Sequence, residues 1–216
     1  MRSTTDLRTL KRRFTIITSD YVAAVFASAL TKKLAVLAPD VSLSILPYTR
    51  EALRQFQRGT IDFLIGPDFA LETKHSAELL FEDRFKCVLW NENSFANTAM
   101  TPEDFFNAPM ILTNFFLENG KSHFERWLEK QTPSIHVVAS LPSFVVLPHF
   151  LAGTDNIATI HERLVPLFAS QPDLSIVDPP VEIPVLREYL VTTEKHKHDL
   201  DAQLLADVMR DVGKEI

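Results

Sequence analysis

Hydrogen-bonding side chains occupy the point where a predicted strand passes into a predicted helix. The stretch RRFTIITSDYVAAVF (residues 12–26) places Ser19, Asp20 and Tyr21 directly after an apolar run and directly before an amphipathic one. Such residues cap helices, and they can also bind a small molecule, because ligands of open α/β folds lie beyond the carboxyl ends of strands. The junction therefore predicts a helix cap or one wall of a small-molecule site, to which Tyr21 would add a ring and a hydroxyl.

Similar junctions recur later in the chain. Pro67 and Asp68 follow the apolar run IDFLIG, and they form either a plain turn or a second part of the same site. Ser143 opens a predicted helix, where it is either the N-cap or a hydrogen-bond donor to a ligand. The other candidates for ligand binding, each beside or within a predicted strand end or helix, are Asn114, Phe115, Phe144, His149 and Thr192.

The residue types that catalyse reactions or hold metals show no recognisable spacing. Cys87 lies in the alternating run FKCVLW, which indicates packing, and no histidine with an acidic partner can be assigned to it. The seven histidines do not form the His-Glu-x-x-His pattern, and neither Cys-x-x-Cys pairs nor phosphate-binding glycine loops occur. We therefore expect no enzymatic activity, no metal ion and no cofactor.

Composition narrows the class of protein further. The net charge of −6 argues against nucleic-acid binding by this chain alone, because phosphate contacts need clustered lysine and arginine. The basic cluster of Arg8 with Lys11-Arg12-Arg13 is explained equally well by a solvated linker and by a phosphate contact. A single cysteine fits a reducing compartment, and neither a membrane span nor a signal peptide is apparent. The sequence thus predicts a soluble, cytoplasmic protein without membrane contact.

Hydrophobic periodicity predicts an α/β fold. In the first part of the chain, strands are expected at residues 13–18, 41–48 and 61–67, with an amphipathic helix from Val22 to Leu37 and a short helix ending at Gly59. The alternation of strand and helix favours right-handed crossovers and a parallel sheet.

A second mixed region follows the long segment of residues 78–93. It contains expected strands at residues 109–114, 135–141 and 156–160 and helices at 123–130 and 143–153, and a return strand and a closing helix end the chain. We expect two Rossmann-like lobes joined by two crossover strands. Lobe I would contain residues 13–85 and 187–216, lobe II residues 86–186, and residues 1–12 would be a linker remnant.

Three stretches resemble the effector-binding domain of LysR-type transcriptional regulators: RRFTIITSDY, LAPDVSLSILPYTREALRQFQRGTIDFLIGP and PHFLAGTDNIATIHERL. The second is the most specific, since a helix followed by Gly-x-Ile-Asp-Phe-Leu-Ile-Gly is the family's usual turn into its third strand. The third is similar to the aromatic-responsive branch that includes the NodD, NahR, PcpR and LinR regulators. The resemblance covers about residues 12–212.

The resemblance implies a type 2 periplasmic-binding-protein fold with an inducer between the lobes. It implies a small aromatic inducer such as a phenol or chlorophenol, a homodimer or tetramer, and promoter contact only through an N-terminal winged helix-turn-helix that these residues lack. Ser143 corresponds to a polar pocket position of the aromatic-responsive relatives. Two alternatives are a solute-binding protein on the same fold, which would need a secretion signal, and an enzyme on a related two-lobed fold.

Overall fold

The computed structural model describes residues 7–68, 75–114, 121–132 and 134–216. Contacts within the chain divide it into unit 1, Met1–Glu82 with Arg187–Ile216, and unit 2, Asp83–Leu186. The chain therefore leaves unit 1 once and returns to it once. The sequence prediction placed these two divisions after residues 85 and 186.

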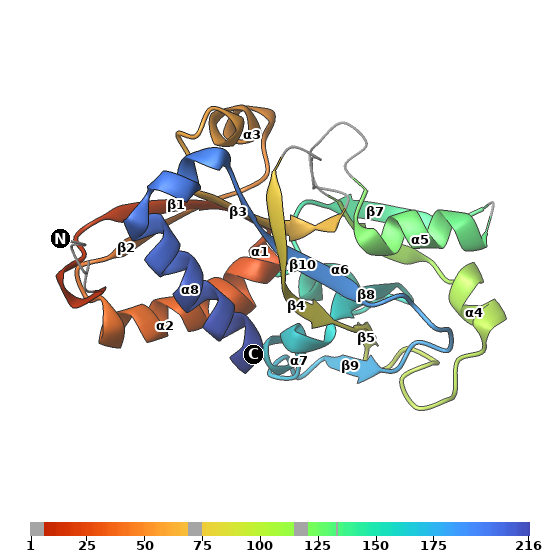
Figure 1. Ribbon diagram of the computed structural model, residues 1–216. Helices are drawn as coiled ribbons and strands as arrows, with labels where there is room; N and C mark the ends of the chain where they lie inside the picture. The colour runs from red at the N-terminus through yellow and green to blue at the C-terminus, as the bar shows by residue number, and fades with distance from the viewer. Residues whose placement is uncertain (1–6, 69–74, 115–120, 133) are drawn as a thin grey trace. The chain divides into compact units, whose positions relative to one another are not determined.

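Unit 1 is built on one five-stranded sheet in the order β2-β1-β3-β10-β4, with α2 and α8 packed against each other beside it (Figure 1). Its strands are β1 (Arg13–Ile17), β2 (Ser42–Leu46), β3 (Phe63–Pro67), β4 (Ser76–Asp83) and β10 (Leu186–Thr192). Its helices are η1 (Leu7–Thr9), α1 (Asp20–Val22), η2 (Ala23–Ala27), α2 (Ser28–Leu37), α3 (Arg50–Gln57), η5 (Glu194–His198) and α8 (Leu200–Glu215).

The sheet of unit 1 is mixed rather than parallel. β1 pairs in parallel with β2 and β3, as the alternating pattern predicted, but β10 runs antiparallel to β3. The pairing of Glu188 with Pro67 explains the difference, because the returning chain enters the sheet at the carboxyl end of β3 and must run the other way. Every residue of β3 is buried, which agrees with its near-continuous apolar sequence.

The first long helix of unit 1 is continuous but not uniformly α-helical. The predicted helix from Val22 to Leu37 is present but begins two residues earlier, at Asp20, and Ala23–Ala27 forms a π-helical segment between α1 and α2. π-Helical turns commonly occur at functional sites, and hydrophobic periodicity does not reveal them because the apolar stripe continues through them. Its Phe26 is fully buried and stacks on Phe81 at 6.0 Å between ring centroids.

Unit 2 is built on a second five-stranded sheet in the order β7-β6-β8-β5-β9, in which β6 pairs in parallel with β7 and β8. Its strands are β5 (Phe85–Trp90), β6 (Met110–Thr113), β7 (Val137–Leu141), β8 (Ile157–His161) and β9 (Leu174–Val177). Its helices are α4 (Pro102–Asn107), α5 (His123–Gln131), α6 (Pro148–Leu151), η4 (Glu162–Leu164) and α7 (Val165–Phe168).

Two expectations for unit 2 were wrong or incomplete. The predicted helix at residues 143–153 is only α6, which begins at Pro148. A proline inside the predicted helix would lack the amide donor and collide with the preceding turn, so the helix can start at Pro148 but cannot run through it. Strand β9 was not predicted, because its four residues follow a short helix without a clear alternating pattern.

Candidate functional site

The carboxyl edge of the unit 1 sheet carries Ser19, Asp20 and Tyr21, and here the capping interpretation is observed directly. Ser19 is the N-cap of α1, and its Oγ accepts a hydrogen bond from the Val22 amide at 3.2 Å. The Asp20 carboxylate accepts from the Tyr21 amide at 2.9 Å, so it turns onto its own helix. The Tyr21 ring is buried in the core and packs edge-on against Phe81.

The neighbouring strand ends of unit 1 add further polar groups. Pro67 is buried at the end of β3 and Asp68 is exposed directly after it. Tyr48, which follows β2, is buried and donates a hydrogen bond to the carbonyl of Ile65. Burial first, and then the negative charge of Glu188, raise the pKa of Tyr48 well above its usual value, so its hydroxyl remains protonated.

Thr192 does not share this edge. Because β10 is antiparallel to β3, Glu188 lies beside Pro67 at the carboxyl edge, whereas Val191 lies beside Leu64. Thr192 follows Val191 and therefore lies toward the amino end of β3. The structure thus does not bring Thr192 together with the other unit 1 candidates.

In unit 2 the carboxyl ends of three parallel strands bring several candidates to one edge. Asn114 follows β6 and its amide donates to the carbonyl of Leu141, the last residue of β7, at 2.9 Å. Asn114 also forms an isolated bridge with Lys121, which brings the start of α5 to the same edge. Ser143, partly exposed, lies in the turn after β7. Phe115 lies outside the described residues.

The centre of this edge is an aromatic cluster, of which the sequence analysis had selected only Phe144. His161 ends β8, and its ring centroid lies 4.8 Å from that of Phe144 and 4.9 Å from that of Phe85. Phe85 in turn stacks on His123, with 6.1 Å between centroids and 8° between ring planes. We call Phe85, His123, Phe144 and His161 the His/Phe cluster.

His161 is a neutral group of this cluster. Its side chain is buried, and burial, followed by the nearby charge of His123, lowers its pKa to about 3. The imidazole therefore carries no charge near neutral pH and offers hydrogen-bonding nitrogen atoms rather than a cation. His149, in contrast, is exposed on α6 and does not belong to the cluster.

The buried polar groups of both units are neutral or acidic. Among the described residues, none of the buried polar side chains is a lysine or arginine. Asp83 is buried and accepts from the Arg84 amide at 2.7 Å, and its other oxygen lies 3.9 Å from Nε of Arg163. Among the described residues, the buried part of these edges therefore offers a ligand no lysine or arginine.

A cavity of about 470 Å³ opens in unit 2 and shares Phe85 with the His/Phe cluster. Its volume lies within the range of small-molecule pockets. Lys86 on its wall donates to Asp178 at 2.6 Å and lies 3.2 Å from Glu162, so this cation is already neutralised. The remaining wall is formed by Arg84, Pro179, Glu182, Ile183 and Val185.

Redox and metal chemistry gain no support from the geometry. Cys87 is buried in β5, and burial raises the pKa of its thiol to about 12, which makes it a poor nucleophile. Within the described ranges, no group of three histidine, cysteine or acidic residues could hold a metal ion. Over the same ranges, the helices are all too short or too polar to cross a bilayer.

The family model for the LysR substrate binding domain matches residues 8–214 of this chain. The chain belongs to this family. It is 29% identical over 198 residues to Nodulation protein D 3 of Rhizobium leguminosarum bv. phaseoli, covering 92% of this chain and 66% of that protein. It is 31% identical to Nodulation protein D 1 of Sinorhizobium fredii, covering 87% of this chain and 58% of that protein.

A solved structure shows the same fold. The regulatory domain of MexT, a transcriptional activator in Pseudomonas aeruginosa, superposes with a TM-score of 0.79 at 22% identity, covering 94% of this chain and 99% of that one. The fold is therefore the type 2 periplasmic-binding-protein fold of LysR effector domains, as predicted. The chain spans less than two thirds of the length of the curated relatives named above.

Proposed function

We propose that this effector-binding domain takes up a small aromatic inducer, such as a phenol or chlorophenol, at the carboxyl edge of unit 2, and that binding controls transcription of a catabolic operon. The observation that carries the proposal is the His/Phe cluster, in which the His161 ring lies between Phe85 and Phe144. Aromatic rings supply apolar contact, and the neighbouring Ser143 and Asn114 supply hydrogen bonds.

The chemistry of this edge favours the neutral form of the phenol. A phenolate would need a cation or several strong donors, whereas the buried polar groups here are uncharged or acidic. The Ser143 hydroxyl can donate to or accept from a phenolic hydroxyl. Most of the affinity would come from covering the ring, at roughly 25 cal/mol for each Å² of apolar surface removed from water.

Calorimetric titration with phenol and a series of chlorophenols tests the proposal. Ser143→Ala should weaken binding by about 1 kcal/mol, or roughly fivefold, because one hydrogen bond is lost while the ring contacts remain. Ser140→Ala is a matched control, since Ser140 is an exposed serine of β7 on the same stretch of chain. Equal affinities of Ser143→Ala and the parent chain would show that the phenol binds elsewhere.

In the same proposal the regulator acts as a homodimer or tetramer and touches promoter DNA only through a part of the protein beyond these residues. β2 is an edge strand of the unit 1 sheet, and Ile45 on it is 37% exposed. Val36, near the end of α2, is 78% exposed. These apolar side chains support self-association through the first lobe.

A further inference from the structure

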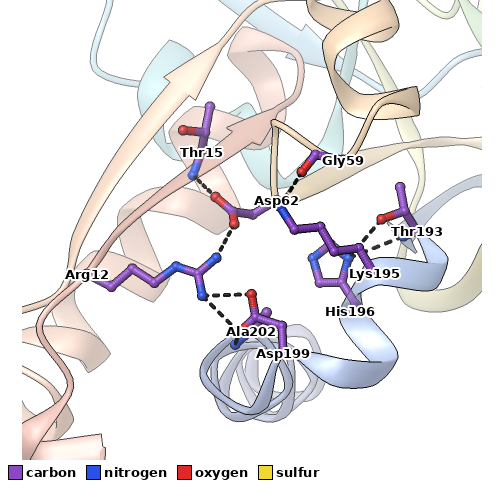
Figure 2. Close-up of polar contacts among 9 residues, drawn as sticks. All are labelled: Arg12, Thr15, Gly59, Asp62, Thr193, Lys195, His196, Asp199 and Ala202. Atoms are coloured by element: carbon purple, nitrogen blue, oxygen red, sulfur yellow. Dashed lines mark hydrogen bonds and ion pairs between the residues drawn. The ribbon is translucent and has the colours of Figure 1, made fainter.

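Arg12 joins three segments of unit 1 that are far apart in the sequence (Figure 2). Its Nη1 donates to both carboxylate oxygens of Asp199, at 2.8 and 2.7 Å, and its Nη2 donates to Asp62 at 2.6 Å. The guanidinium carbon also lies 4.4 Å from the centroid of the Phe14 ring. The sequence placed Arg12 in a basic linker cluster, but its side chain is only 28% exposed and is paired on two sides.

Each of the two carboxylates also accepts a hydrogen bond from a backbone amide. The second oxygen of Asp62 accepts from the Thr15 amide at 2.9 Å, which ties the start of β3 to β1. Asp199 is the N-cap of α8, where it accepts from the Ala202 amide at 3.1 Å. The acceptors are therefore already oriented, and the charge-assisted hydrogen bonds need little further ordering. We call Arg12, Asp62 and Asp199 the clasp.

The turn that precedes α8 is anchored beside the clasp. Lys195 donates to the carbonyl of Gly59 at 2.7 Å, and the His196 ring lies 4.8 Å from that of Phe63. The side chain of Gln203 reaches back from α8 to the His196 carbonyl at 2.9 Å. η5 and the first turn of α8 therefore behave as one packed piece.

Strand β10 connects this piece to the opposite edge of the sheet. Its Glu188 lies beside Pro67 at the carboxyl edge, and the strand runs from there toward the amino end of β3 before the chain enters η5. The strand thus joins the carboxyl edge to η5, which directly precedes Asp199.

We propose that the clasp couples the position of α8 to the segment Leu7–Arg12, which leads into β1. A shift of β10 or α8 that withdraws Asp199 breaks the two hydrogen bonds from Nη1 and releases this lead-in segment. A movement produced at the carboxyl edge of unit 1 is thereby passed to the chain that precedes the sheet. This coupling does not depend on which ligand binds, so it can be tested separately from the phenol proposal.

Hydrogen exchange of the whole chain, followed by mass spectrometry, tests the clasp without a ligand. Arg12→Gln should raise exchange by about tenfold both in the lead-in segment, where the Leu10 amide donates to Leu7, and at the Ala202 and Gln203 amides of α8. Arg13→Gln is the matched control, because Arg13 is an exposed arginine next in the chain. Faster exchange in only one of the two places, or the same effect from Arg13→Gln, would overturn the coupling.

Asp199→Asn separates the clasp from simple helix capping. Asparagine caps helices as well as aspartate does, so faster exchange in the first turn of α8 would come from the lost ion pair and not from a lost cap. The lost charge should still release the lead-in segment, which would exchange about as fast as in Arg12→Gln. The proposal fails if the lead-in segment keeps its parent protection in Asp199→Asn, or if it is unprotected in the parent chain.

Discussion

Protonation of His161 should destabilise unit 2 as the pH falls below neutrality. Burial holds the pKa of His161 at about 3 in the folded protein, compared with an ordinary value of 6.5. Between these two values the unfolded chain binds a proton that the folded chain does not, so the free energy of unfolding decreases as the pH is lowered. The stability is fully present above about pH 6.5 and is lost progressively below it.

The size of this loss in stability follows from the difference between the folded and unfolded pKa of His161. Once the pH is about one unit below the unfolded pKa, the loss reaches about 1.4 kcal/mol, and it grows by about 1.4 kcal/mol for each further unit. His161→Gln removes the titrating group and should remove this part of the pH dependence, whatever its own effect on stability at neutral pH.

Urea unfolding at about pH 7.5, 6.5 and 5.5 measures this slope. Tryptophan fluorescence reports on unit 2 specifically, because both tryptophans, Trp90 and Trp127, lie in it. His149→Gln is the matched control, since His149 is an exposed histidine of the same unit. If His161→Gln and the parent chain lose the same free energy between about pH 7.5 and 5.5, the buried, neutral state of His161 is refuted.

Three further results are expected. Ser19→Ala should lower the free energy of unfolding, measured in thermal or urea melts, by about 1 kcal/mol because the helix cap is lost. Asp20→Ala should lower it by less, because Ser19 and not Asp20 accepts from the Val22 amide, and equal losses would contradict this. Gly213→Ala should lower the free energy of unfolding by about 1–3 kcal/mol in the same melts, because a Cβ at this position would collide with the Leu80 carbonyl. Alanine otherwise favours helix, so a more stable variant would contradict this contact. The isolated chain should not retard a promoter fragment in a gel-shift assay, because its net charge is −6, and a sequence-specific shift would contradict that expectation.

The order of strands and helices could be predicted because its signals are local. The alternation around Phe14 and the turn at Gly59 with its positive φ of 71° each follow from a few neighbouring residues. The antiparallel direction of β10 could not be predicted in this way, because it depends on where the chain re-enters the sheet. The truncated helix at Pro148 had a local signal, which the apolar periodicity around it outweighed.

The sequence could predict those residues of the candidate site that directly follow a predictable strand. Applying the carboxyl-end rule to Asn114 and Ser143 selected residues that the structure brings to one edge of unit 2. The same rule applied to the strand NIATI would have selected His161, which follows it directly. His123 and Phe85 carry no such signal, because the stacking of His123 on Phe85 and the contact of Phe85 with His161 depend on how α5 and β5 pack.

A crystal structure of the chain with a brominated phenol tests most directly whether an aromatic inducer binds at the His/Phe cluster. The anomalous signal of bromine locates the ring independently of the fitted coordinates. We predict a peak in contact with Phe144, with the phenolic oxygen within hydrogen-bonding distance of Ser143. A fully occupied bromine site away from Phe144 and Ser143, or none at saturating phenol, would contradict the proposed function.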